Sequence, residues 1–206
     1  MLKKIQQDSH DKFEALGYPS KKLENWKFSP SKHLNKYTSK NLDQSNFSIE
    51  KYSDKYTLCF INGELATESL NHFIYKDSIT ILDIGELEDN SICSTSSNFE
   101  KEAFFHLGLS TVKTGKYFEF HKGVKFENPI KIINIYNKSE KDLRISSFNV
   151  FKLNEGNDIS IIEKDINEGS DSFNLNLNKF ICPDNTILNH SMLYDDKTES
   201  NYLGYN

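Results

Sequence analysis

The side chains best suited to chemistry are a histidine and a cysteine late in the chain. His190 lies in "ILNHSML" on the same strand face as Leu188 and Met192, where an imidazole can act as a base or a metal ligand. The pattern favours the alternative, a core or interface histidine bonded to a backbone carbonyl. Cys182 precedes Pro183 at a strand end, and a thiolate there can coordinate metal. No CxxC, HxH or CxxxC partner lies nearby, so we predict an inert, buried or half-buried thiol.

The other two cysteines predict no site. Cys59 lies between Leu58 and Phe60 in a run typical of a core, and Cys93 lies in a polar loop without a neighbour that lowers its thiol pKa. The three cysteines have no paired spacing, which indicates free thiols in a reducing compartment. The N-terminus has no apolar signal region, and no window reaches the roughly 20 apolar residues of a membrane span. The expected location is the cytoplasm.

Two basic segments invite a binding interpretation. The stretch "FHKGVKF" places His121, Lys122 and Lys125 around a glycine, but it lacks the order of a phosphate-binding loop and therefore predicts an exposed turn. Lysines also surround the only tryptophan and Phe28, a combination that can bind single-stranded nucleic acid. These lysines are Lys21, Lys22, Lys27 and Lys32. Lysines on short helices more often form a solvated face whose stems cover apolar surface, so we expect no nucleic-acid partner.

Ordinary enzyme signatures are missing from the sequence. It holds no GxSxG, HExxH or GxGxxG motif, which leaves hydrolase and dehydrogenase chemistry without support. We therefore predict no catalytic residue and no metal site.

The composition predicts a soluble globular chain rich in strands. Of its 206 residues 36% are hydrophobic, and 15 Phe with 10 Tyr indicate a core of aromatic and β-branched side chains. The formal net charge of −5, without long runs of one sign, favours neither nucleic acid nor an anionic membrane as a partner. Residues 1–60 carry 11 lysines and 7 acids, whereas the remainder carries 14 basic and 23 acidic residues. The two parts therefore differ in charge.

Helical segments are expected in the first 37 residues. Apolar residues at helical spacing predict an amphipathic helix over residues 2–16, ended by Gly17. Ser20 is expected to cap a short helix through Trp26, and Ser29 to start another one with proline as its first residue. Leu23 and Trp26 would share a face, so the indole ring is predicted to anchor a basic helical unit to an acidic, strand-rich body.

Strand signals dominate the rest of the chain. "YTLCFINGEL" predicts a strand that turns at Asn62-Gly63, "SITILDI" a second strand and "EAFFHLGL" a short helix. Beyond residue 115, six strand candidates follow one another at regular intervals: "KYFEF", "PIKIINIY", "RISSFNVFKL", "DISIIEKDI", "SFNLNLNKFI" and "TILNHSMLY". Such a series forms an all-β sandwich, a barrel or a parallel β-helix.

Two details favour the β-helix. In "FNLNLNKFI" apolar side chains alternate with Asn174, Asn176 and Asn178, which are expected on an exposed strand face. The segments between the strands hold few of the two-residue hairpin pairs that antiparallel meanders use. We therefore predict a mainly β fold, a parallel β-helix preceded by a small α-helical N-terminal subdomain.

Two stretches resemble the SufB/SufD family of iron–sulfur cluster assembly proteins. "ALGYPSKKLENWKFSPSKHL" is similar to the family's N-terminal pattern, with matches at Gly17, Pro19, Ser20, Lys22, Glu24, Trp26, Lys27, Phe28 and Ser29. "GKYFEFHKGVKFENPIKIINIY" resembles the run that opens the family's β-helix, at Gly115, Gly123, Val124, Pro129 and Ile130. "FINGEL" and "EAFFHLGL" fit the family's order between them. His121 replaces the family's usual proline, and the helix lacks its Asn and Thr. The short leader is most like the N-terminal portion of SufD.

The resemblance implies a right-handed parallel β-helix and a noncatalytic scaffold that acts with a SufB-like homologue and the SufC ATPase. An iron–sulfur cluster would be held only transiently in that complex. The family's partner-binding residues belong to a C-terminal part that this stretch does not match, so His190 and Cys182 receive no such role. An open coil end is expected to self-associate or to be covered by "DDKTESNYLGYN".

Three parts are therefore expected: a helical subdomain over 1–37, a linker and irregular α+β entry segment over 38–99, and a β-helix over 100–206. Two other function classes stay open. One is a β-helix enzyme of the carbohydrate lyase or acyltransferase type, with a catalytic histidine between coils. The other is a sugar- or nucleic-acid-binding module.

Overall fold

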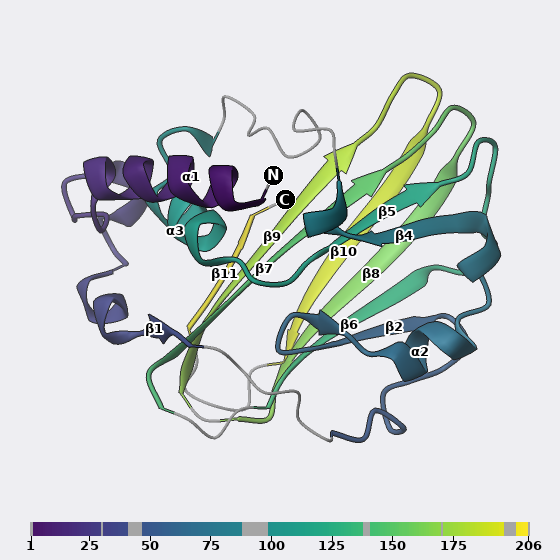
Figure 1. Cartoon of the computed structure of the whole chain (residues 1–206), viewed down its shortest axis with the longest axis horizontal. Coiled ribbons are helices and arrows are strands. Elements are labelled where there is room, and N and C mark those ends of the chain that lie inside the picture. The colour runs from purple at the N-terminus through teal and green to yellow at the C-terminus, as the bar shows by residue number, and fades with distance from the viewer. Residues whose placement is uncertain are drawn as a thin grey trace.

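The computed structural model describes residues 2–29, 31–40, 47–87, 99–137, 141–169, 171–195 and 201–205. Within these ranges the protein is mainly β, with two mixed sheets and a helical unit at one flank (Figure 1). The predicted mainly β class with an N-terminal helix is confirmed.

The first helix, α1 (Leu2–Leu16), has the predicted bounds. It ends because Gly17 adopts a φ of 65° and its N–H donates to the Phe13 carbonyl at 2.7 Å, a left-handed cap that a residue without a Cβ takes easily. Phe13 is the apolar residue of this helix that is fully buried, whereas Leu16 is 44% exposed.

The next two short helices differ from their predicted starts. The 3-10 helix η1 (Glu24–Trp26) follows Leu23 and has no side-chain cap, and the Ser20 hydroxyl instead accepts from the Lys22 N–H at 3.3 Å. The 3-10 helix η2 (Lys32–Lys36) begins after Ser31, and the predicted proline start at residue 30 lies outside the described residues. Leu23 is 53% exposed, so it does not share a buried face with the tryptophan as predicted.

The predicted hairpin at Asn62-Gly63 is confirmed. Strands β2 (Thr57–Ile61) and β3 (Glu64–Leu65) pair antiparallel, and the two turn residues have φ angles of 50° and 90°, as a tight hairpin requires. The chain continues through α2 (Thr67–His72), η3 (Lys76–Ser78), β4 (Ile79–Asp83) and η4 (Ile84–Glu86).

In the described residues from 99 onward the chain forms one helix and seven strands. Helix α3 (Ala103–Thr111) is followed by β5 (Lys116–Phe120), β6 (Ile130–Tyr136), β7 (Leu143–Lys152), β8 (Asp158–Asn167), β9 (Ser172–Ile181), β10 (Ile187–Asp195) and β11 (Asn201–Tyr205). Each of the six strands expected after residue 115 is present. The seventh, β11, lies in the tail that was expected to cover the open end, and it extends a sheet by pairing with β9.

Successive strands alternate between the two sheets. Sheet A has the order β11-β9-β7-β5-β4, with β1 (Thr38–Ser39) beside β7, and sheet B has the order β10-β8-β6-β2-β3. From β6 onward each strand lies in the sheet opposite to its predecessor, and the strands from β5 to β11 pair parallel with the strand two positions away (Figure 1). The antiparallel pairs, β2 with β3 and β4 with β5, lie at one side of each sheet. Residues of the expected entry segment thus belong to both sheets.

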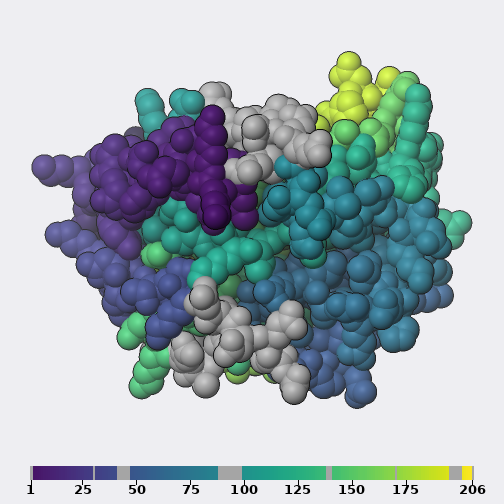
Figure 2. Space-filling model, in the orientation of Figure 1, coloured from purple at the N-terminus to yellow at the C-terminus, as the bar shows by residue number. Residues whose placement is uncertain are grey.

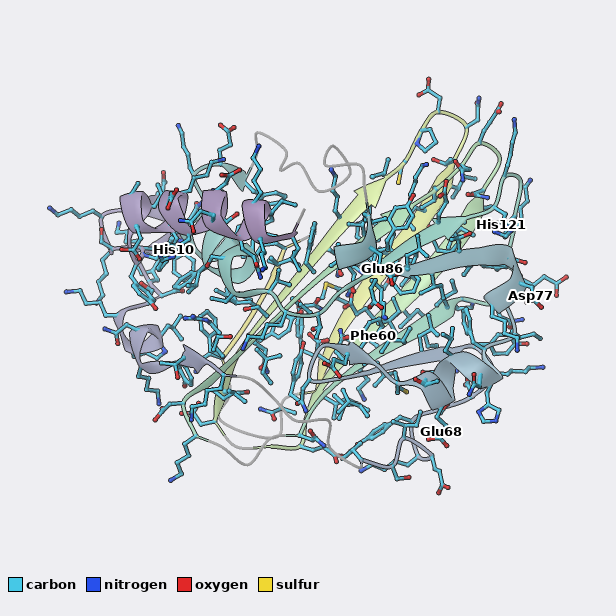
Figure 3. All side chains as sticks on the ribbon, viewed as in Figure 1. His10, Phe60, Glu68, Asp77, Glu86 and His121 are labelled. Carbon is cyan, nitrogen blue, oxygen red and sulfur yellow. The ribbon has the colours of Figure 1, made fainter. Side chains whose placement is uncertain are left out.

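The interior between the sheets is apolar over part of its length. Phe60, Phe118, Phe151 and Ile161 belong to one buried cluster drawn from both sheets, and Figure 3 shows Phe60 between them. A second apolar layer lies on the outer face of sheet A, where α3 packs on β7 and β9 and α1 packs on α3. In Figure 2 the helical unit forms one flank of the visible face.

Candidate functional site

A group of buried polar side chains continues the apolar interior between the sheets. Along β8 the face that begins with Ile159 and Ile161 carries on with Glu163 and Asp165, and all four side chains are buried. Neighbouring strands add amide and phenol groups to the same region. We call this group the polar interior; it comprises Asn134, Tyr136, Glu163, Asp165, Asn174, Asn176, Asn178, His190 and Tyr202.

Glu163 is the centre of this group. Its side chain is 1% exposed, and its two oxygens accept from Asn134 Nδ2 at 2.7 Å, Asn176 Nδ2 at 2.6 Å and Asn178 Nδ2 at 2.9 Å. His190 Nε2 completes the set at 3.1 Å. A buried carboxylate is tolerated only when its lone pairs are satisfied, and four donors provide this. The donors come from both sheets, so the carboxylate also joins them.

Asp165 lies two residues further along the same strand and accepts fewer hydrogen bonds than Glu163. Its Oδ1 accepts from Asn134 Nδ2 at 2.7 Å, but its buried Oδ2 makes no hydrogen bond. Burial, and after it the charge of Glu163, raise the pKa of this carboxyl to about 7 against the opposing effect of the Tyr202 hydroxyl and the Asn134 amide. Asp165 is therefore a carboxyl group that holds a proton close to neutrality.

The asparagine face of β9 is buried, which corrects a prediction. Asn174, Asn176 and Asn178 were expected on an exposed face but are 2%, 0% and 5% exposed. The reason is that α3 covers the apolar face of β9, with Leu177 in contact with Gly108, so both faces of this strand are covered. The asparagines face the opposite sheet, where they donate to Glu163.

His190 lies in contact with the polar interior and near the surface. The prediction of a backbone carbonyl partner is wrong, since its Nε2 bonds to the Glu163 carboxylate. The imidazole is 14% exposed, and its ring packs on Phe180 with centroids 4.8 Å apart. A buried carboxylate that orients a half-buried imidazole is an arrangement that can prepare a base or a metal ligand.

The cysteines form no site with these residues. Cys59 is buried in the core as predicted, and burial raises its thiol pKa to about 12, which leaves it inert. Cys182 is exposed and so not the buried or half-buried thiol expected, and partial desolvation raises its pKa, which lowers its reactivity. Cys93 lies outside the described residues.

The basic turn at residues 121–125 is exposed, as predicted. Gly123 has a φ of 76°, and Lys122 forms an ion pair of 2.6 Å with the exposed Glu155. His121 lies 3.2 Å from the Thr80 hydroxyl. The turn thus connects strand ends and presents no nest for a phosphate.

Trp26 anchors the helical unit, as predicted, although its ring is half-buried. The indole packs edge-on against Phe104 of α3 at 5.0 Å, while Phe28 is 88% exposed beneath the Lys27 ammonium at 5.3 Å. At the other end of the unit Lys36 pairs with the acidic Asp171 at 2.8 Å. The basic unit therefore rests on the acidic body through both apolar and charged contacts.

An open groove of about 800 Å³ lies between this unit and strand β11. Trp26, Phe28 and His33 line one wall, Phe173 contributes from β9, and residues 201–205 form the other wall. The His33 imidazole and Asn201 side chain approach each other across it at 3.1 Å. The groove presents aromatic surface, and His33 and Glu102 are among its lining residues.

Within the described ranges no three His, Cys, Asp or Glu side chains come together as a metal site. In the same ranges no helix combines the length and apolarity needed to cross a bilayer.

Sequence reasoning missed the acids of β8. The available signal is the alternation in "DISIIEKDI", which places Glu163 and Asp165 on the face of Ile159 and Ile161. Tyr202, another missed member, lies in a segment expected only to cover an end. Its partners come from strands far away in sequence, so no local pattern identifies them.

Comparison of the chain with protein-family models and with curated protein sequences finds no match.

Proposed function

We propose that this protein is a noncatalytic scaffold subunit of SUF-type iron–sulfur cluster assembly that acts with a SufB-like homologue and the SufC ATPase. The sequence basis is the resemblance of residues 15–34 and 115–136 to the SufB/SufD patterns. The structural support is the arrangement of strands on which such a scaffold would rest.

The observation that carries the proposal is the regular offset between stacked strands. The chain advances by 33 residues from β5 to β7, by 31 from β6 to β8, by 29 from β7 to β9 and from β8 to β10, and by 28 from β9 to β11. We interpret this as a flattened, right-handed parallel β-helix of two sheets, because parallel stacking with a similar advance at each passage is the pattern of a solenoid. A sandwich built from hairpins would pair consecutive strands instead.

The helical unit fits the same proposal. Gly17, Trp26 and Phe28 belong to the matched N-terminal pattern, and two of them have a structural role: Gly17 ends α1, and Trp26 seats the unit on α3. Phe28 is exposed beside Lys27 and is free to contact a partner. The pattern would thus mark a unit that docks on the side of the β-helix.

A scaffold acts through its shape and through the strand edges that it presents to a partner. Strand β10 ends sheet B and β11 ends sheet A within the described residues, and Ile187, Leu193 and Tyr194 of β10 are each more than half exposed. Unpaired strand edges beside apolar side chains are surfaces that another sheet covers. The proposed partner that covers these edges is a homologous protein or a second copy of this chain. The iron–sulfur cluster is then the cargo of the resulting complex.

The direct test is co-expression with SufB and SufC followed by affinity purification. We expect all three proteins to co-purify in the presence of this chain. A Phe28→Ala variant tests whether the exposed ring contributes, with Leu82→Ala on β4 as a matched surface control. If the folded wild-type protein does not retain SufB or SufC, and a version extended by any further encoded residues also fails, the proposal is wrong.

One observation favours a second candidate, an enzyme on a β-helix. The Glu163–His190 pair of 3.1 Å resembles an oriented base. His190→Ala would then abolish turnover in screens of acyl-transfer or polysaccharide-lyase substrates under conditions where circular dichroism shows the variant folded, although the loss of a Glu163 donor lowers its urea midpoint. A loss of stability without any measurable wild-type turnover would identify His190 as a structural donor.

A further inference from the structure

Three buried polar atoms in the polar interior are not hydrogen-bonded to any described residue. Asp165 Oδ2, Asn174 Oδ1 and Tyr202 Oη have no hydrogen-bond partner in the described part of the chain, although Asp165 and Asn174 are only 6% and 2% exposed. Two of these atoms can only accept, and the third is a hydroxyl. Buried groups of this kind are normally satisfied, so the deficit needs an explanation.

The three groups lie in one layer between the sheets. Asn174 is in register with Tyr202 on β11. Strand β8 ends at Asn167 and β9 begins at Ser172, and Glu163 of β8 contacts Asn176 of β9. Asp165 must therefore lie opposite Asn174, and the Tyr202 hydroxyl acts on its carboxyl from β11.

One added proton satisfies all three atoms. If Asp165 Oδ2 carries the proton, the acid can donate to Tyr202 Oη, and the phenol can donate onward to Asn174 Oδ1. The same proton removes a negative charge beside the Glu163 carboxylate, which accepts four hydrogen bonds. With Asp165 ionised, the single Tyr202 hydroxyl hydrogen would face two acceptors, Asp165 Oδ2 and Asn174 Oδ1, and two carboxylates would lie close together.

A route to solvent exists for this proton. The ring of Tyr202 lies 4.6 Å from that of Tyr194, which is 56% exposed. A Cβ added at Gly204 would meet the two hydroxyl oxygens at 3.2 Å and 3.3 Å, so both hydroxyls flank this glycine. The buried acid is therefore connected through two phenols to the surface of β10.

We propose that Asp165 holds an exchangeable proton in the strand interior, and that its loss loosens the β10–β11 end of the molecule. The protonated acid joins β8 to β11, while Glu163 joins β8 to β9 and β10. When the proton is lost, the contact between β8 and β11 is lost with it, and β11 can then separate from β9. The proposal is independent of the SUF assignment.

The groups that face Asp165 are few. Strand β6 contributes Asn134 and Tyr136, β9 contributes Asn174, β10 contributes Tyr194, and β11 contributes Tyr202. The charged or titrating neighbours are Glu163 and, bonded to it, His190. Burial raises the pKa values of the three tyrosines, so they stay neutral throughout the relevant range.

The sign of the pH effect follows from the raised pKa of Asp165. The unfolded carboxyl titrates near its ordinary value of 3.8 and the folded one near 7. The folded state therefore binds the extra proton between these values, and the folding equilibrium weakens as pH rises through that window. One proton changes the equilibrium constant by up to about tenfold per pH unit, and the loss is complete above the folded pKa.

The test compares wild type with Asp165→Asn. The amide cannot titrate, yet its Nδ2 donates where the protonated acid does. Urea unfolding between about pH 5 and about pH 7 should show the wild-type equilibrium constant falling by several-fold per unit, with a much flatter profile for the variant. Asp77→Asn, which removes an exposed carboxyl at the periphery (Figure 3), is the matched control and should keep the wild-type slope.

Hydrogen exchange gives a second measurement that needs no variant. Backbone amides of residues 201–205 should lose protection as pH rises from about 6 to about 8, beyond the intrinsic rate change, while β7 amides keep theirs. The carboxyl carbon of Asp165 should titrate near neutrality by NMR. Parallel slopes for wild type and Asp165→Asn, or a carboxyl that titrates in the ordinary aspartate range, would overturn the proposal.

Discussion

At the scale of single residues, Glu163 has the most unusual surroundings. A carboxylate 1% exposed would be excluded from an apolar interior, yet here three asparagine amides and an imidazole donate to it. Removing one member of such a set leaves the others unpaired, which costs more than the net value of any single bond. The stability of the polar interior should therefore depend on this acid more than on any one of its donors.

Glu163→Gln tests this dependence. The new amide replaces an acceptor oxygen by a donor that faces other donors, so we expect a loss of about 3 kcal/mol or more in the free energy of unfolding. Urea denaturation by circular dichroism measures it. Glu68→Gln, on the exposed side of α2, is the control and should change the value by less than about 0.5 kcal/mol. A loss below about 1 kcal/mol for Glu163→Gln would show that the carboxylate is not central.

Trp26 allows a second comparison at this scale. Its ring is half-buried against Phe104, so Trp26→Ala should cost about 2 kcal/mol, less than a fully buried aromatic ring. Phe28→Ala, two residues away and 88% exposed, should cost less than about 0.5 kcal/mol. Thermal unfolding of both variants gives the difference. Equal effects would mean that the indole does not anchor the helical unit.

At the scale of elements, close backbone approach decides where strands can pair. Gly115 precedes β5, and a Cβ there would lie 1.9 Å from the Phe148 carbonyl oxygen of β7. Backbone cannot move aside as a side chain can, so only glycine allows this contact. The conformational freedom of glycine is not the reason at this position, since space alone requires it.

Gly115→Ala should therefore destabilise the protein by about 3 kcal/mol or more, because β5 and β7 must separate to admit the methyl group. Gly85→Ala is the matched control, since nothing lies within 4 Å of its added Cβ, and it should be close to neutral. Guanidinium unfolding of the pair measures the contrast. Similar midpoints for both variants would contradict the close approach of these strands.

Much of the element level could be predicted from the sequence. The spacing of apolar residues gave the bounds of the first helix, and Asn62-Gly63 gave the hairpin. Alternation shows which residues share a strand face, but it does not show what covers that face. Asn174 and Asn176 were therefore assigned to solvent, although α3 and the opposite sheet enclose their strand. The polar interior depends on contacts between distant strands, which local patterns do not contain.

At the scale of the whole molecule, the outer edges of β10 and β11, which pair with no further strand of the described residues, are surfaces available for association. Leu193 and Ile187 are exposed on β10, the last strand of sheet B. Two such edges with apolar neighbours favour pairing with another sheet, which natural proteins often prevent by placing lysine on an edge strand.

Leu193→Lys should therefore reduce self-association. We expect the wild-type sedimentation coefficient to rise with protein concentration and that of the variant to stay near the monomer value. Leu82→Lys on β4, at the opposite side of sheet A, is the control and should behave like wild type. A wild type that remains monomeric at all concentrations would show that this edge is protected in solution.

The alternation of strands also sets the order in which the chain can fold during synthesis. Thr57 of β2 pairs with Lys131 of β6, so the first parallel contact of sheet B joins residues far apart in the sequence. Pairings of long sequence separation form slowly, because the intervening loop must be closed first. At about 5–20 residues per second, β2 waits several seconds after leaving the ribosome before its partner emerges. During that interval the hairpin at Asn62-Gly63 can pair β3 with one edge of β2, while the opposite edge, which later meets β6, stays unpaired until β6 emerges.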